Sequence, residues 1–206
     1  DGTCNNATGN VAVTINGVPD QLTGGQGGAV HSSPANYNGV AYYGDDSGVL
    51  YGYTIATATA LSGFPFDAKV QAGSGAKILG RPAIHIEGGT SYVYFVTDNG
   101  YLFKVNGTDG TQPWAGVQLL STATSVSTTP AVFNTGDSSL PAQDFVFVGA
   151  GDGTNAYLYK VRASDGVLAD TSIPLGTDTK SSPAVGAGSV YLGVTGGTDG
   201  ILRLNP

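Results

Sequence analysis

The 206-residue chain has no methionine, one cysteine and two histidines, and it carries only eight Lys or Arg and 15 Asp or Glu residues. A single cysteine excludes an internal disulfide, a c-type haem site and a cysteine-rich zinc site, because each needs more thiols. No run of about 18 apolar residues occurs, so nothing in the sequence is expected to insert into a membrane. Because methionine is missing even at position 1, we expect either that a signal peptide or larger leader was removed before Asp1, or that the chain was trimmed.

The few charges are mostly acidic, with a net charge of −7 and a pI near 4.4. Basic residues are nowhere clustered. This balance argues against nucleic acid and anionic membrane surfaces as partners and favours a role of the charge in solubility.

Helical periodicity is also lacking, whereas short apolar or alternating runs recur along the whole chain. The 33 glycines, 11 tyrosines and abundant Thr, Ser, Val and Asn are typical of short strands joined by tight turns. The sequence therefore predicts an all-β protein.

A Pro-Ala pair recurs at intervals of 48, 48 and 53 residues. Each pair is followed by a short apolar strand, a second strand rich in aromatic and β-branched residues, an acidic turn with glycine, and a third strand. The four pairs are Pro34-Ala35, Pro82-Ala83, Pro130-Ala131 and Pro183-Ala184. Self-similarity of this length with four strands per unit is typical of propeller blades. We predict one domain, 1–206, that folds as a four-bladed β-propeller of four-stranded antiparallel blades. The expected blades are 31–68, 80–120, 127–173, and 180–206 completed by 7–15.

The last unit stops at Leu204-Asn205-Pro206 without an outer strand. Residues 7–13 read as its continuation, so we expect the N-terminal strand to complete the last blade and close the ring. Closure removes open sheet edges. The alternative is half of an eight-bladed propeller that a second chain completes.

The order Pro-Ala, apolar strand, Asp-Gly turn, x-Leu-Tyr/Phe strand, Thr/Ser-Asp-Gly and Trp resembles the quinoprotein-like (pyrroloquinoline-quinone) repeat. The segment from Val96 to Val105, continued to Trp114, is the clearest copy. The family contains quinone-dependent alcohol dehydrogenases and also non-catalytic members, among them a lipoprotein that helps to assemble outer-membrane barrels.

Departures from the family weaken the enzymatic implication. The family's blade-docking Trp is present only as Trp114, and its quinone-binding members resemble eight-bladed rings with an adjacent-cysteine disulfide and a calcium site. We therefore expect a non-catalytic member with no cofactor, so that the chain is not an enzyme.

Candidate binding residues gather at the starts of the first strands, which should surround one mouth of the propeller axis. Such a ring of hydroxyl and basic groups suits water or a small anionic ligand. The simpler interpretation is that these small side chains only fill the narrow axis of the propeller. The set is His31, Ser32, Ser33, Arg81, Thr128, Thr129, Lys180, Ser181 and Ser182.

Three further features are weaker. The acidic turns offer Asp45, Asp46, Asp152 and Asn155 as calcium ligands, but Asp, Asn and Gly occupy such turns for backbone reasons alone. Cys4 is a candidate for a bridge to another chain. Asn6 and Asn106 match the N-glycosylation pattern.

These features favour a secreted, non-catalytic propeller at the cell surface, outside the cell or in the periplasm. It would act as a protein-interaction or structural module of an extracellular assembly, of which a filament or pilus-associated array is one form. Other protein chains are then the expected partners, in part through Cys4. The alternatives are a fragment or subunit of a quinoprotein-type oxidoreductase, which predicts an absorbing cofactor, and a glycan-binding propeller.

Overall fold

The computed structural model describes residues 12–15, 18–21, 27–123, 126–133, 144–169, 172–177, 181–194 and 200–204. These residues form antiparallel strands and one four-residue helix, α1 (Lys69–Ala72), which confirms the all-β prediction. No helix in this part of the chain has the length and apolar character needed to span a membrane.

Four antiparallel sheets follow one another along the chain, and we call them blades 1 to 4. Blade 1 contains β3 (Ala35–Tyr37), β4 (Val40–Gly44), β5 (Val49–Thr54), β6 (Thr59–Ala60) and β7 (Phe66–Asp67). Blade 2 contains β8 (Ala83–Glu87), β9 (Thr90–Val96), β10 (Tyr101–Asn106) and β11 (Val117–Gln118). Blade 3 contains β12 (Ala131–Phe133), β13 (Phe145–Gly151), β14 (Ala156–Arg162) and β15 (Ile173–Gly176). Blade 4 contains β16 (Ala184–Gly186), β17 (Ser189–Val194) and β18 (Gly200–Leu204).

The innermost strand of every blade begins at the alanine of a Pro-Ala pair. Proline has no N–H to give to a sheet ladder, so it suits the position just before the first strand. The alanines pair with equivalent residues of the second strands: Tyr42, Tyr94, Phe147 and Tyr191. These pairs fix a common register for the four blades.

Apolar side chains fill the spaces between consecutive blades. One cluster joins blades 1 and 2 through Leu50, Phe95 and Phe103, a second joins blades 2 and 3, and a third joins blades 3 and 4. Blades 2 and 3 thus have an apolar cluster on each face, which explains why their second and third strands read as nearly continuous apolar runs.

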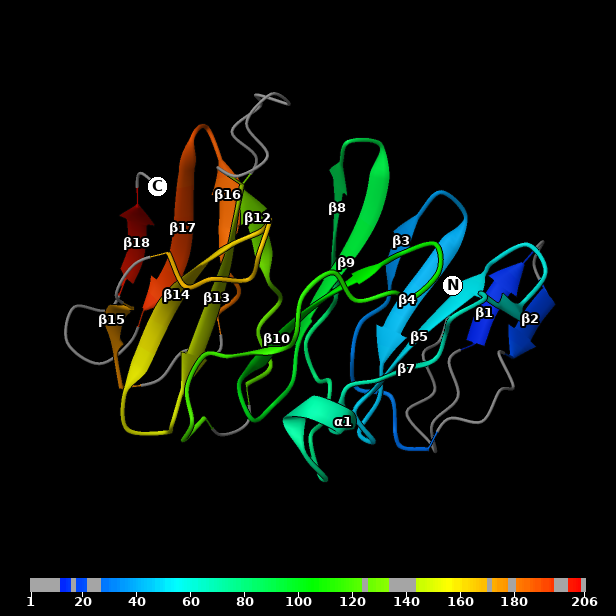
Figure 1. The fold of residues 1–206 in the computed structure, drawn as a ribbon, viewed down its shortest axis with the longest axis horizontal. Helices are drawn as coiled ribbons and strands as arrows, with labels where there is room; N and C mark the ends of the chain where they lie inside the picture. The colour runs from blue at the N-terminus through cyan, green and yellow to red at the C-terminus, as the bar shows by residue number, and fades with distance from the viewer. Residues whose placement is uncertain are drawn as a thin grey trace.

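Figure 1 shows the blades side by side in chain order along the longest axis of the molecule. The innermost strands follow the same order, since β3 contacts β8, β8 contacts β12, and β12 contacts β16. No comparable contact joins β16 to β3 among the described strands.

The predicted closure of the ring is not confirmed. β1 (Ala12–Ile15) pairs with β2 (Val18–Gln21), and neither joins β18 in a sheet. Figure 1 places β1 and β2 beside blade 1, at the end of the molecule opposite blade 4. Residues 7–11, on which the prediction also relied, lie outside the described residues.

Candidate functional site

A groove of about 420 Å³ opens along the innermost strands of blades 1 and 2 and reaches the start of blade 3. It is lined by Ala35, Asn36, Tyr37, Arg81, Pro82, Ala83, Ile84, Ile86, Thr129 and Pro130. Innermost strands surround the axis of a propeller, so this groove lies where the sequence predicted a binding mouth.

The groove combines exposed apolar side chains with one cation. Tyr37 and Ile86 remain 43% and 36% exposed. The guanidinium of Arg81 is anchored from one side, where its Nε donates to the carbonyl oxygen of Pro34 at 3.2 Å. A groove that offers both an exposed aromatic ring and a guanidinium suits a ligand that has an apolar side chain together with a carboxylate.

Of the predicted mouth residues, the structure brings Arg81 and Thr129 into the groove. The backbone N–H of Thr129 donates to Ser182 Oγ at 2.8 Å, which links the starts of blades 3 and 4. Ser33 and Ser182 are exposed, and Lys180 lies outside the described residues.

Three predicted hydroxyl residues bond to the second strand of their own blade. Ser32 Oγ accepts from the N–H of Gly44 at 3.2 Å, Thr128 Oγ1 donates to the carbonyl of Gly149 at 2.8 Å, and Ser181 Oγ accepts from the N–H of Gly193 at 3.1 Å. Ser32 and Thr128 are buried, so they are not groove-lining groups.

Blade 2 differs from the other blades at these two positions. At the equivalent places it has Gly80 before the proline and Val96 in the second strand. A Cβ on Gly80 would lie 2.3 Å from the carbonyl oxygen of Thr128. At this place blade 2 has no room for a side chain because the backbone of Thr128 lies there, whereas Ser32, Thr128 and Ser181 use their hydroxyls to link strands within their own blades.

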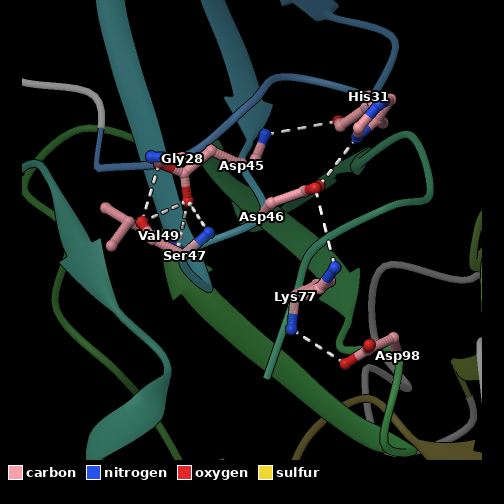
Figure 2. A network of polar contacts seen from close by, with 10 residues as sticks. Gly28, His31, Asp45, Asp46, Ser47, Val49, Lys77 and Asp98 are labelled. Carbon is pink, nitrogen blue, oxygen red and sulfur yellow. Dashed lines mark hydrogen bonds and ion pairs between the residues drawn. The ribbon is translucent and has the colours of Figure 1, made fainter. Parts of the chain in front are cut away.

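His31 belongs to a polar network outside the groove, at the turn between β4 and β5 (Figure 2). Its Nδ1 lies 2.8 Å from Asp46 Oδ1, and Lys77 Nζ lies 3.7 Å from the other oxygen of the same carboxylate. The N–H of Lys77 donates to Asp98 Oδ1 at 2.8 Å. This network connects the turn between β4 and β5 of blade 1 to the turn between β9 and β10 of blade 2. His31 is an exposed member of it and does not line the groove.

Protein donors surround the fully buried carboxylate of Asp45 (Figure 2). It accepts hydrogen bonds from the backbone N–H groups of Ser47 at 2.9 Å, Val49 at 3.0 Å and Gly28 at 3.2 Å. The hydroxyls of Ser47 and Tyr51 donate to it as well, at 2.7 and 3.0 Å. Because donors point at both oxygens, the carboxylate is satisfied by the protein's own groups, and a cation there would face N–H and O–H groups.

Asp152 and Asn155 form a second self-satisfied turn. The N–H groups of Asn155 and Thr154 both donate to Asp152 Oδ1 at 2.8 Å, and they hold the pKa of Asp152 below its usual range. Within the described ranges no three His, Cys, Asp or Glu side chains gather as ligands for a metal ion. Cys4 and Asn6 lie outside these ranges, whereas Asn106 Oδ1 accepts from the N–H of Thr108 in an exposed turn.

Sequence reasoning missed a buried ionic cluster between blades 2 and 3. Lys104 Nζ lies 2.6 Å from Glu87 Oε2, donates to the carbonyl of Ala163 at 2.9 Å and sits 4.1 Å from the centre of the Tyr92 ring. The hydroxyl of Tyr94 donates a hydrogen bond to the other carboxylate oxygen of Glu87. Burial lowers the pKa of Lys104 and raises that of Tyr94. The one sign of this cluster in the sequence is Lys104, a lysine inside the otherwise largely apolar strand β10.

His85 faces the same interface rather than the groove. Its Nε2 lies 3.3 Å from Asp144 Oδ2 of blade 3, while its neighbours Ile84 and Ile86 line the groove. The alternation of a strand puts His85 on the opposite face from these isoleucines. The two histidines of the chain therefore do not share one channel.

Comparisons with known proteins place this geometry among β-propellers. No family model matches the sequence, and no curated protein matches it. Solved structures do. BamB from Moraxella catarrhalis superimposes with a TM-score of 0.64 at 17% identity, over 90% of this chain and 53% of that one. The computationally designed Ika4 protein gives a TM-score of 0.60 at 16% identity, over 87% of this chain and 94% of Ika4.

A quinohemoprotein alcohol dehydrogenase from Comamonas testosteroni is also similar, with a TM-score of 0.54 at 14% identity. The match covers 81% of this chain but 29% of the dehydrogenase. The chain thus spans about half the length of BamB and less than a third of this enzyme. At these identities the likenesses show the fold alone: the chain has a β-propeller fold built from four antiparallel sheets.

Proposed function

We propose that this chain is a non-catalytic β-propeller that binds a segment of another protein in its axial groove. It would work outside the cytoplasm, as an interaction module of a secreted or cell-surface assembly. The observation that carries the proposal is the groove itself, whose lining combines the exposed side chains of Tyr37 and Ile86 with the cation of Arg81. Aromatic and arginine side chains are the residues that most often dominate the energy of protein interfaces.

The chemistry of the groove favours an extended peptide with an apolar side chain and an acidic one. The apolar side chain would cover Tyr37 and Ile86, and the carboxylate would pair with the outward N–H groups of Arg81. No carboxylate stands among the groove-lining residues, so an acidic ligand would meet no like charge there.

The buried ionisable side chains, which could have been catalytic groups, make contacts within and between blades, and this supports a structural role for them. Lys104 has Glu87, Ala163 and Tyr92 as partners, and His85 contacts Asp144 at the interface between two blades. None of these six residues lines the groove. A calcium-bound quinone would need acidic and amide ligands, and the groove lining offers only the amide of Asn36 and no acidic group, so the residues present do not fit that cofactor.

A display experiment tests the proposal. A phage library of random dodecapeptides is selected against the immobilised protein, and the enriched peptides are assayed against Tyr37→Ala and Arg81→Ala. We expect enriched sequences with an acidic residue near an aromatic or aliphatic one, and at least about tenfold weaker binding to both variants.

Val167→Ala is the matched control, because Val167 is exposed to a similar extent, 49%, on a turn of blade 3 away from the groove. This variant should bind the peptides as the unaltered protein does. Failure to enrich any sequence, or equal loss of binding in the control, contradicts the proposal.

A further inference from the structure

The free edge of β8 lies in the axial groove. β8 is the last strand of its sheet and pairs only with β9 among the described strands. It lies in the middle of the chain and contacts the innermost strands of both neighbouring blades, β3 and β12. Its residues Ala83, Ile84 and Ile86 line the groove. An unpaired edge presents N–H and C=O groups with which an extended chain can form hydrogen bonds.

The hairpin of β8 and β9 determines which residues face this edge. Glu87 pairs with Thr90 across a turn of two glycines, whose φ angles are +55° and +85°. In such a hairpin the residues next to the turn exchange both of their backbone hydrogen bonds, and every second pair along the ladder does the same. The backbone groups of Glu87 and of every second residue before it therefore point to β9. Those of Ile84 and Ile86 point the other way, to the free edge.

Ile84 and Ile86 thus offer two N–H donors and two C=O acceptors to the groove. No backbone hydrogen bond outside the sheets joins either of them to another described residue. The innermost strands β3 and β16 are shorter, with three residues each against five in β8. The same alternation leaves one outward-facing residue in each of them, Asn36 in β3 and Val185 in β16. β8 consequently presents a longer unpaired edge than these two strands.

The side chains beside this edge match the ligand expected for the groove. A strand added to β8 would continue its pleat, so every second side chain of the added strand would lie on the same face as Ile84 and Ile86. An apolar side chain there would cover Ile86, and a carboxylate near the start of β8 would pair with Arg81, the groove's cation. In strand addition the main-chain hydrogen bonds supply affinity, and the side chains supply selectivity.

We infer that a segment of another protein binds in the groove as an extended strand, hydrogen-bonded to the backbone of Ile84 and Ile86 as the next strand of blade 2. This inference rests on the proposed function and adds how the ligand is held. The partner segment is extended and acidic, and it has no proline at the two residues that pair with β8, because proline has no N–H to donate.

Single N-methylation of the ligand backbone tests this inference. A dodecapeptide enriched in the display experiment is synthesised with one N-methyl group at each position in turn, and fluorescence anisotropy measures its Kd. N-methylation removes one N–H donor and keeps the side chain. We expect two sensitive positions, separated by one residue, at which binding weakens at least about tenfold, and a change of less than about twofold at the residue between them.

Ile86→Pro tests the same bonds from the side of the protein. It removes an N–H that faces away from β9, where an edge strand tolerates proline. Ile86→Ala keeps the N–H and measures the part of the affinity that the side chain supplies, so it should weaken binding less than Ile86→Pro does. Val185→Pro is the matched control, because Val185 is the outward-facing residue of β16 and does not line the groove. It should bind the peptide as the unaltered protein does.

Circular dichroism establishes that each variant is folded, and the N-methylated peptides decide the question if a proline variant is not. Methylation that weakens binding at every position alike, or at none, overturns the inference and leaves groove binding in place. Equal binding by Ile86→Pro and Ile86→Ala also overturns it. Failure to enrich any peptide contradicts the proposed function and this inference with it.

Discussion

The indole N–H of Trp114 donates to the carbonyl oxygen of Ala163 at 3.1 Å, which joins blade 2 to the turn that follows β14 in blade 3. The same carbonyl accepts from Lys104 Nζ at 2.9 Å. The ring of Trp114 covers Gly166, where an added Cβ would lie 2.8 Å from the indole. Trp114 therefore fastens consecutive blades, as the resemblance to quinoprotein-like repeats implied.

Gly166→Ala should destabilise the protein more than Gly188→Ala. The two glycines have nearly the same backbone, with φ of +74° and +73°, so alanine brings similar strain to both. Only Gly166 has the indole against it, whereas nothing lies within 4 Å of the added Cβ at Gly188. We expect a difference of about 1–3 kcal/mol in the free energy of unfolding, measured with urea. Equal losses would mean that Trp114 does not pack on Gly166.

Lys104→Met should cost about 3–5 kcal/mol, because it leaves the largely buried Glu87 without its cation. Lys77→Met is the control: the Lys77 side chain is 45% exposed, and its 3.7 Å contact with Asp46 should contribute at most about 1 kcal/mol. Urea unfolding of both variants measures the two costs. If Lys104→Met and Lys77→Met cost the same, the cluster between blades 2 and 3 is not buried as described.

The protein should lose stability as the pH rises from 10 to 12. Burial raises the pKa of Tyr42 from 10.0 to about 12, so between these values the unfolded chain releases a proton that the folded chain keeps. The unfolded state then binds fewer protons, and the free energy of unfolding falls by up to about 1.4 kcal/mol per pH unit for this residue.

Tyr42→Phe removes this contribution together with the 2.7 Å hydrogen bond from Tyr42 to the carbonyl of Gly107. It should be less stable at neutral pH, yet its stability should fall less steeply above pH 10. Tyr51 and Tyr94, whose pKa values are also raised by burial, keep part of the slope in both proteins. Urea unfolding at several pH values measures the slopes, and identical slopes would contradict the burial of the Tyr42 hydroxyl.

Thr128→Ala should lower the free energy of unfolding by about 1 kcal/mol, because it removes the hydrogen bond to Gly149 within blade 3. Ser33→Ala, at an exposed position of the same motif in blade 1, should change it little. Thr128→Ala should also bind groove peptides normally. A loss of peptide binding with unchanged stability would reassign Thr128 to the ligand site.

The sequence predicted the strands well because the Pro-Ala pairs and acidic turns are local signals. The innermost strands begin at Ala35, Ala83, Ala131 and Ala184, directly after the prolines. Alignment of the x-Leu-Tyr pattern, however, matches Leu202 with Leu102, while the pairing of strands makes Ile201 its equivalent. A shift of one residue exchanges the two faces of a strand, so the pattern alone did not show on which face of blade 4 Ile201 lies.

The site was predictable only in part, for the same reason. Arg81 and Thr129 reach the groove, but the direction of a hydroxyl depends on the residue opposite it in the neighbouring strand. Ser32 and Thr128 turn to glycines 12 and 21 residues further along the chain. Tyr37 and Ile86, the apolar part of the groove, looked like ordinary strand residues.

Photo-crosslinking from position 37 tests most directly whether the axial groove binds a segment of another protein. Tyr37 is replaced by benzoylphenylalanine, and the protein is irradiated with the peptides that the display experiment enriches. The account predicts crosslinks from position 37 and none from position 167, which is exposed to a similar extent in the unaltered protein, 43% against 49%. Equal crosslinking from both positions, or none from position 37, would contradict it.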